Sequence, residues 1–174
     1  MAAGNKISFS SANVPPRILG KIANLTPELA KATLEHFEPY IAEMSVENAI
    51  IVTVKGEVYH CAGDLNGIPL KYFDELGEKL NGATMTHNHP IGSDNEYTFS
   101  NDDISLFKRF KLARLRGVDE RFVYEIDYDF SNIDEISSEL ADGQNLISNE
   151  YDGRHRLVII RALNEKFGYR RWLR

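Results

Sequence analysis

The chain has 174 residues, of which 43% are hydrophobic and 26% charged, which suits one globular domain with a substantial core. No apolar run approaches the ~18 residues of a membrane-spanning helix, and no apolar stretch of the secretory kind follows the first six residues. The single cysteine, Cys61, excludes an internal disulfide framework and favours a reducing compartment. We therefore expect one cytoplasmic (intracellular) domain without a membrane partner.

Charge is unevenly distributed along the chain, whose formal net charge is −6. Residues 119–152 are rich in acidic side chains, whereas residues 154–174 are basic. The negative total argues against nucleic acid as the main partner. Two interpretations of the basic tail stay open: a solvated face that partly complements the acidic block, or a patch that binds a partner.

The N-terminal part predicts an extended arm followed by a helix. Residues 1–25 contain two adjacent prolines and little periodicity, with one short strand expected around Lys6–Ser10. Thr26 is a suitable helix cap, and Pro39 is expected to kink or split the helix that follows. The apolar residues expected to face the core from this helix are Leu29, Leu34, Phe37, Ile41 and Met44.

The rest of the chain alternates between predicted strands and helices. In chain order, the pattern predicts strands over 49–54 and 57–62, a helix from Pro69 to about Leu80, a strand over 83–89, a helix from Ser100 to about Arg116, and a strand over 121–128. The remainder, 129–174, is predicted to form a helical extension. This order indicates a single α/β (α+β) domain over 1–174: an arm (1–25), a core (26–128) built on a mixed sheet flanked by helices, and the extension.

The segment from Thr86 to Pro90, Thr-His-Asn-His-Pro, carries the strongest chemical signal. Side chains alternate along a strand, so His87 and His89 point the same way and can offer two imidazoles to one ion. Asp103 lies in the first turn of the next helix, which can fold back beside the end of that strand. Two histidines and one carboxylate leave an open fourth position, as in catalytic zinc sites, so we predict one Zn²⁺ bound by these three residues.

These residues resemble the JAMM (MPN+, or JAB domain) zinc metalloproteases, whose motif is a distant glutamate, His-x-His-Pro and Ser-x-x-Asp. The His-Asn-His-Pro form is especially similar to bacterial RadC-like and phage-associated members. The order of predicted elements also matches the core of the family over about residues 26–128. The resemblance implies an MPN/JAB-like fold, and it favours Asp103 over Asp102 as the third ligand.

In this family a glutamate near the start of the first core strand is the general base, and the serine of the motif stabilises the oxyanion. The resemblance therefore assigns Glu47 as the base and gives Ser100 a catalytic role beside its role as a helix cap. Glu57 competes for the role of base because it starts the paired strand, while Glu43 should still lie on the preceding helix. The other histidines, His36, His60 and His155, lack partners at ligand spacing and are interpreted as structural or surface residues.

The segment 91–99 between the two halves of the motif is a few residues longer than in the usual family pattern. It carries Asp94, Asn95 and Glu96. It can be a solvated loop, a segment that contacts substrate, or a source of a carboxylate that reaches the metal. We expect Tyr97 and Phe99 to hold its returning limb against the domain.

Taken together, the residues and the resemblance predict a zinc-dependent hydrolase that cleaves a peptide or isopeptide bond. Its substrate would be a protein or peptide, such as the tail of a ubiquitin-like or small modifier protein that adds to a sheet edge. Two alternatives stay open. One is a phage or mobile-element assembly or binding protein that uses the MPN fold as a scaffold, and the other is a RadC-like protein associated with nucleic acid.

Overall fold

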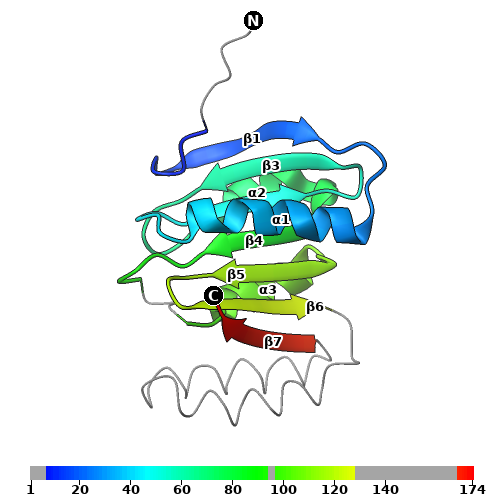
Figure 1. The fold of residues 1–174 in the computed structure, drawn as a ribbon. Coiled ribbons are helices and arrows are strands. Elements are labelled where there is room, and N and C mark those ends of the chain that lie inside the picture. Colours follow the sequence, from blue (N-terminus) through cyan, green and yellow to red (C-terminus); the bar gives the residue numbers. More distant parts are fainter. Residues whose placement is uncertain (1–6, 94–96, 128–167) are drawn as a thin grey trace, which may run out of the picture.

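The computed structural model describes residues 7–93, 97–127 and 168–174. These residues form one seven-stranded mixed sheet with helices on both faces (Figure 1). In chain order its elements are β1 (Val14–Lys21), α1 (Pro27–Ile41), β2 (Asn48–Val52), β3 (Glu57–Ala62), α2 (Leu70–Leu76), the 3₁₀ helix η1 (Gly77–Leu80), β4 (Thr84–Asn88), α3 (Asn101–Arg109), β5 (Arg114–Val118), β6 (Phe122–Asp127) and β7 (Gly168–Leu173). The strand order is β1-β3-β2-β4-β5-β6-β7. Among the described strands, only β4 and β5 pair in parallel (Figure 1), so the expected mixed α/β architecture is confirmed.

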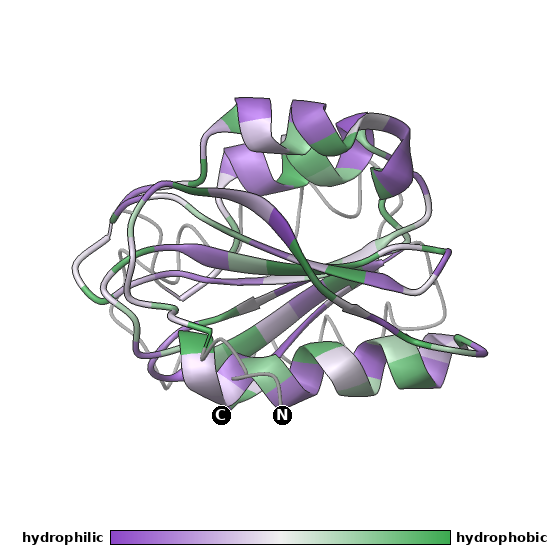
Figure 2. Cartoon of the chain, turned by 90° about the horizontal axis from the view of Figure 1, so that it is seen from above, coloured by the Kyte–Doolittle hydropathy of each residue, from purple (hydrophilic) through white to green (hydrophobic). Residues whose placement is uncertain are grey.

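The sheet separates two apolar layers, as the view in Figure 2 shows. On one face, Ala30 and Leu34 of α1 pack against Ile50, Val52 and Val58 of the sheet. On the other face, α2, η1 and α3 cover the larger core, whose strand residues include Ala49, Met85, Leu115 and Tyr124. Among the described residues, no helix is long and apolar enough to cross a membrane.

The strand of the N-terminal arm lies later than the sequence suggested. Residues 7–10 form no strand, whereas Val14–Lys21 forms β1 and pairs with β3 at the edge of the sheet. Pro15 and Pro16 made this segment look irregular. An edge strand tolerates proline because one row of its backbone groups needs no partner in the sheet.

Helix α1 begins as predicted, because the Thr26 side chain accepts a hydrogen bond from the Leu29 amide at 3.2 Å. Pro39 does not split the helix, which continues to Ile41. Near the end of a helix, a proline removes one backbone bond without interrupting a long stretch. Two residues expected to face the core from this helix do not: Leu29 is 41% exposed, and Met44 lies beyond the helix end.

The predicted helix from Ser100 to Arg116 is wrong in its second half. The helix ends at Arg109, Lys111 adopts a φ of 51°, and the Leu112 amide bonds the Phe107 carbonyl as the chain reverses. Residues 114–118 then form β5 beside β4. The basic residues of this stretch resembled the end of a long helix. One of them, Arg116, instead forms buried ion pairs with residues of α1 and β6.

Arg116 is the centre of a buried charge network. It is 2% exposed, and its guanidinium contacts Glu38 of α1 at 2.7 Å and Glu125 of β6 at 2.6 Å. The Thr86 hydroxyl also donates to Glu38, at 3.0 Å. Because every charge in this network has an opposite partner, the α1 face of β4–β6 can be polar and still be buried.

The predicted helical extension is wrong for residues 168–173, which form β7 antiparallel to β6. The remainder of that prediction, 129–167, lies outside the described residues, as does Tyr128 at the end of the expected last strand. Arg170 of β7 pairs with Glu125 and Asp127 of β6. The basic tail therefore complements the acidic block in part, through contacts within the sheet rather than on a solvated face.

His60, interpreted above as a structural or surface residue, has a structural role in a buried network that joins three strands. Its Nε2 lies 2.8 Å from the Asn48 side-chain oxygen on β2, and Arg17 Nε of β1 donates to its Nδ1 at 3.1 Å. Burial, assisted by the Arg17 charge, lowers the pKa of His60 to about 4. Folding therefore holds this ring neutral.

We expect this ring to make the protein less stable in mild acid. An unfolded histidine has a pKa near 6.5, so between pH 6.5 and 4 the unfolded chain takes up a proton that the folded chain refuses. The free energy of unfolding should fall by about 2–3 kcal/mol as the pH falls through this window. Denaturant unfolding of wild type and His60→Gln measures the effect, with the exposed His36→Gln as control. Identical pH profiles for wild type and His60→Gln would contradict it.

Candidate metal centre

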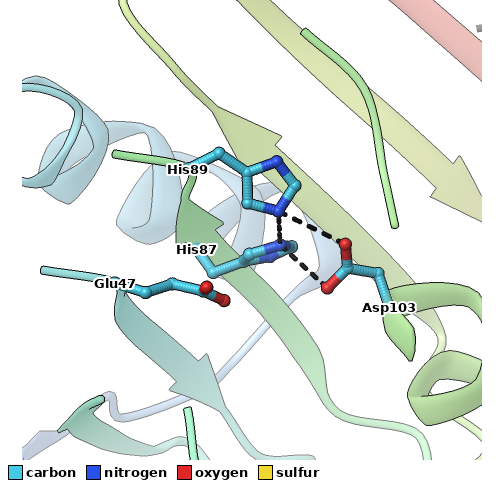
Figure 3. A group of neighbouring side chains, drawn as sticks. All are labelled: Glu47, His87, His89 and Asp103. Carbon is cyan, nitrogen blue, oxygen red and sulfur yellow. Dashed lines mark hydrogen bonds and ion pairs between the residues drawn. The ribbon is translucent and has the colours of Figure 1, made fainter. Parts of the chain in front are cut away.

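Strand β4 presents both histidines of the motif to the same side of the sheet. His87 and His89 are each 1% exposed, and their Nε2 atoms lie 3.0 Å apart (Figure 3). His89 follows the last residue of β4, but its amide still bonds the Val118 carbonyl of β5 at 3.0 Å. The parallel ladder thus extends one residue further and fixes the second ring beside the first.

Asp103 reaches the same point from the first turn of α3. This helix connects the parallel strands β4 and β5, so its N-terminus lies at the carboxyl end of β4, where crossover connections commonly build sites. Asp103 Oδ1 lies 3.1 Å from His87 Nε2, and Oδ2 lies 3.3 Å from His89 Nε2. Ser100 caps the helix as predicted, since its hydroxyl accepts from the Asp103 amide at 3.1 Å.

Glu47 completes the group from the start of β2. Ala49 pairs with His87 in the antiparallel register of β2 and β4, and Glu47, two residues before Ala49, points to the same side of the sheet. Glu47 is 7% exposed, and a hydrogen bond from its amide to the Asp64 carbonyl, 2.7 Å long, holds the backbone in place. One ligand atom from each of Glu47, His87, His89 and Asp103 lies within 4.8 Å of the others.

The other residues considered as general base or third ligand are not part of this cluster. Glu57 begins β3, at the end of the strand away from Glu47, and its carboxylate pairs with Lys79 at 3.3 Å. The Glu43 side chain is 71% exposed and contacts Arg174. Asp102 lines the same pocket as the four clustered residues but is not one of them. His36 is exposed, as expected for a surface residue, and His155 lies outside the described residues.

The electrostatics of the group suit a cation. Although burial opposes it, the two histidines hold the pKa of Asp103 well below its usual range. Burial would also lower the pKa of His89, but the hydrogen bond and charge of Asp103 outweigh burial and raise it to about 9. Burial raises the pKa of Glu47, against the lowering effect of both histidines. A divalent cation would displace the proton on His89 and balance the carboxylates.

The spacing of the ligand atoms fits a tetrahedral zinc ion. With zinc–ligand distances of about 2.0–2.1 Å, neighbouring ligand atoms of a tetrahedron lie about 3.3 Å apart. The three separations among His87 Nε2, His89 Nε2 and the Asp103 oxygens are 3.0, 3.1 and 3.3 Å. These three residues could therefore hold the ion with small adjustments, and Glu47 lies beside them.

Two asparagines that the sequence analysis did not single out hold the strands of the site together. Asn88, between the two histidines, accepts a hydrogen bond from the Asn48 amide at 2.6 Å and donates to the Val46 carbonyl at 3.1 Å. Asn48 also donates to Val46, at 2.9 Å. Both residues are fully buried, and both donate to the carbonyl of Val46, the residue before Glu47. A polar residue inside a buried strand was the available signal, since it needs internal partners.

Tyr124 of β6 is a second residue that the sequence analysis did not connect with the site. Its hydroxyl lies 2.7 Å from His89 Nδ1, and burial raises its pKa well above the ordinary value, so the phenol stays neutral. The ring passes over Gly117 of β5, where a Cβ atom would lie 2.0 Å from Tyr124 Cε2. Gly117 is therefore required for this contact. The corresponding nitrogen of His87, Nδ1, has no hydrogen-bond partner among the described residues.

The returning limb of the 91–99 segment is held as expected. The Tyr97 amide donates to Asp119 at 2.8 Å, the Thr98 hydroxyl lies 2.9 Å from the Tyr169 hydroxyl, and Phe99 is 2% exposed in the core. Asp94, Asn95 and Glu96 lie outside the described residues.

Comparison of the chain with protein-family models, curated proteins and solved structures finds no match.

We expect Tyr124→Phe to weaken zinc binding by roughly 10- to 100-fold, with one zinc per chain at saturation. A ring that binds metal through Nε2 donates its Nδ1 hydrogen to a second partner, and Tyr124 is that partner for His89. Competition with a coloured chelator gives the dissociation constants.

Tyr72→Phe is the matched control, because it also removes one buried hydroxyl, which donates to the Asn13 carbonyl at 3.2 Å. It should leave zinc affinity unchanged. Equal affinities of Tyr124→Phe and wild type would mean that Tyr124 does not orient His89.

Proposed function

We propose that this protein is a zinc-dependent hydrolase of the JAMM type that cleaves a peptide or isopeptide bond. The observation that carries the proposal is the convergence of Glu47, His87, His89 and Asp103 on one point at the carboxyl end of β4. These are the residues that the family resemblance selects, and they come from three separate parts of the sequence. An MPN/JAB-like fold is part of the same proposal, as is an intracellular location.

Within the proposed reaction, each residue has a distinct task. His87, His89 and Asp103 would hold the ion, which supplies Lewis-acid chemistry by polarising a carbonyl oxygen and lowering the pKa of water. The Glu47 carboxylate would accept a proton from the attacking water and deliver it to the leaving amine. Its buried position beside the three ligand residues suits both steps, because a general base must lie within reach of the water that it deprotonates.

The Ser100 hydroxyl would have to rotate to stabilise the oxyanion, which is the role that the resemblance assigns to it. Its hydroxyl donates to Asp103 Oδ2 at 2.7 Å, so the hydrogen points toward the ligand carboxylate. Ser100 also lines the pocket. Rotation of the hydroxyl toward the pocket would allow it to donate to a developing oxyanion while its oxygen still caps α3.

The two alternatives receive less support from the described residues. A scaffold for assembly or binding has no need of four converging ligand groups. For a role on nucleic acid, the arginines of the tail should be available to phosphates. Arg170 instead pairs with Glu125 and Asp127, Arg171 donates to the Tyr97 carbonyl, and Arg174 contacts Glu43.

Two substitutions distinguish a metal ligand from the general base. His89→Ala should lose zinc and hydrolysis together, whereas Glu47→Gln should retain about one zinc per chain and lose hydrolysis by roughly 10²- to 10⁴-fold. Metal analysis gives the first quantity, and mass spectrometry of a peptide library incubated with the zinc-loaded protein gives the second.

Glu57→Gln is the control, since it removes a carboxylate at the far end of β3, and it should change neither quantity. The assignment of Glu47 fails if Glu47→Gln loses zinc or keeps its activity. The proposal as a whole fails if demetallated protein binds no zinc at micromolar concentration.

A further inference from the structure

The pocket that contains the four clustered residues extends well beyond them. Its volume is about 590 Å³, within the range of pockets that accept whole small molecules. Beyond the cluster it is lined by Ile68, Leu70 and Phe73 from the α2 side and by Leu106 from α3. The catalytic chemistry proposed above uses none of these side chains.

The alternation of side chains along β4 places the apolar part of the pocket next to the four clustered residues. Met85 and His87 lie on one face of β4, His89 continues that face just beyond the end of the strand, and Met85 also lines the pocket. The strand thus presents a thioether at one end and two imidazoles at the other. Residues two apart lie about 6.5 Å from each other, so the apolar end begins one side-chain length from the metal ligands.

Part of the apolar lining of the pocket is exposed. Met85 and Phe73 are almost fully buried, Ile68 and Leu106 are partly buried, and Leu70 is 47% exposed. An exposed leucine beside a hollow surface gains contacts when an apolar group enters. A diglycine tail would leave this volume empty.

We propose that this end of the pocket binds a large apolar side chain, such as leucine, methionine or phenylalanine, on the substrate residue next to the cleaved bond. The inference rests on the proposed function and narrows its substrate class. The scissile carbonyl would lie at His87 and His89, and the side chain would lie over Met85, between Leu70 and Leu106.

Three hydroxamates test the inference without requiring turnover: acetohydroxamate, 4-methylpentanohydroxamate and 3-phenylpropanohydroxamate. They share a metal-binding head and differ in their apolar tail. Calorimetric titration of zinc-loaded protein should show the two larger compounds binding at least about tenfold more tightly than acetohydroxamate, since even one methylene in an apolar pocket contributes about that factor.

Leu70→Gln should reduce this advantage several-fold and leave the affinity for acetohydroxamate unchanged. Leu29→Gln is the matched control, because Leu29 is similarly exposed at 41% but lies on α1, across the sheet, and it should preserve the advantage. Equal affinities for all three compounds, or equal effects of the two variants, would overturn the inference and leave the metal site intact. Binding of none of them would overturn the proposed function itself.

Discussion

The antiparallel register between β2 and β4 is the constraint on which the site depends. It sets Ala49 against His87, and Glu47 lies two residues before Ala49 on the same face. A shift of one residue would turn both histidines toward α1 and away from Asp103. Asn48 and Asn88 fix this register at the end of the strands, where a ladder would otherwise fray.

The parts of the site that could be predicted are those governed by local rules. Alternation on a strand aligned His87 with His89, and the capping pattern at Ser100 placed Asp103 in the first turn of a helix. Glu47 was assigned through the family resemblance, and the structure brings it to the cluster. Tyr124 could not be found this way, because its contact with His89 depends on β5 lying between them with a glycine at the crossing point.

The strands that the sequence analysis missed share one physical cause. Each of β1, β5 and β7 carries residues that disfavour a buried strand by themselves: the prolines of β1, Arg116 of β5 and Arg170 of β7. The prolines of β1 are tolerated because this strand lies at the edge of the sheet, and the two arginines because they have partners distant in sequence. Arg116 requires Glu38, and Arg170 requires Glu125 and Asp127. A window of neighbouring residues contains no information about such partners.

Strand β7 has a consequence for the order in which the molecule is made. Tyr169 contacts Thr98 over a separation of 71 residues, and Arg171 donates to the Tyr97 carbonyl over 74. During synthesis the histidines, Asp103 and their supporting strands all emerge before these two partners exist. The chain leading into the cap of α3 is therefore fully held only after residues 168–173 have been translated and have closed a long loop, which is a slow step in folding. A nascent chain would carry all the ligands of the site before it could hold them rigidly.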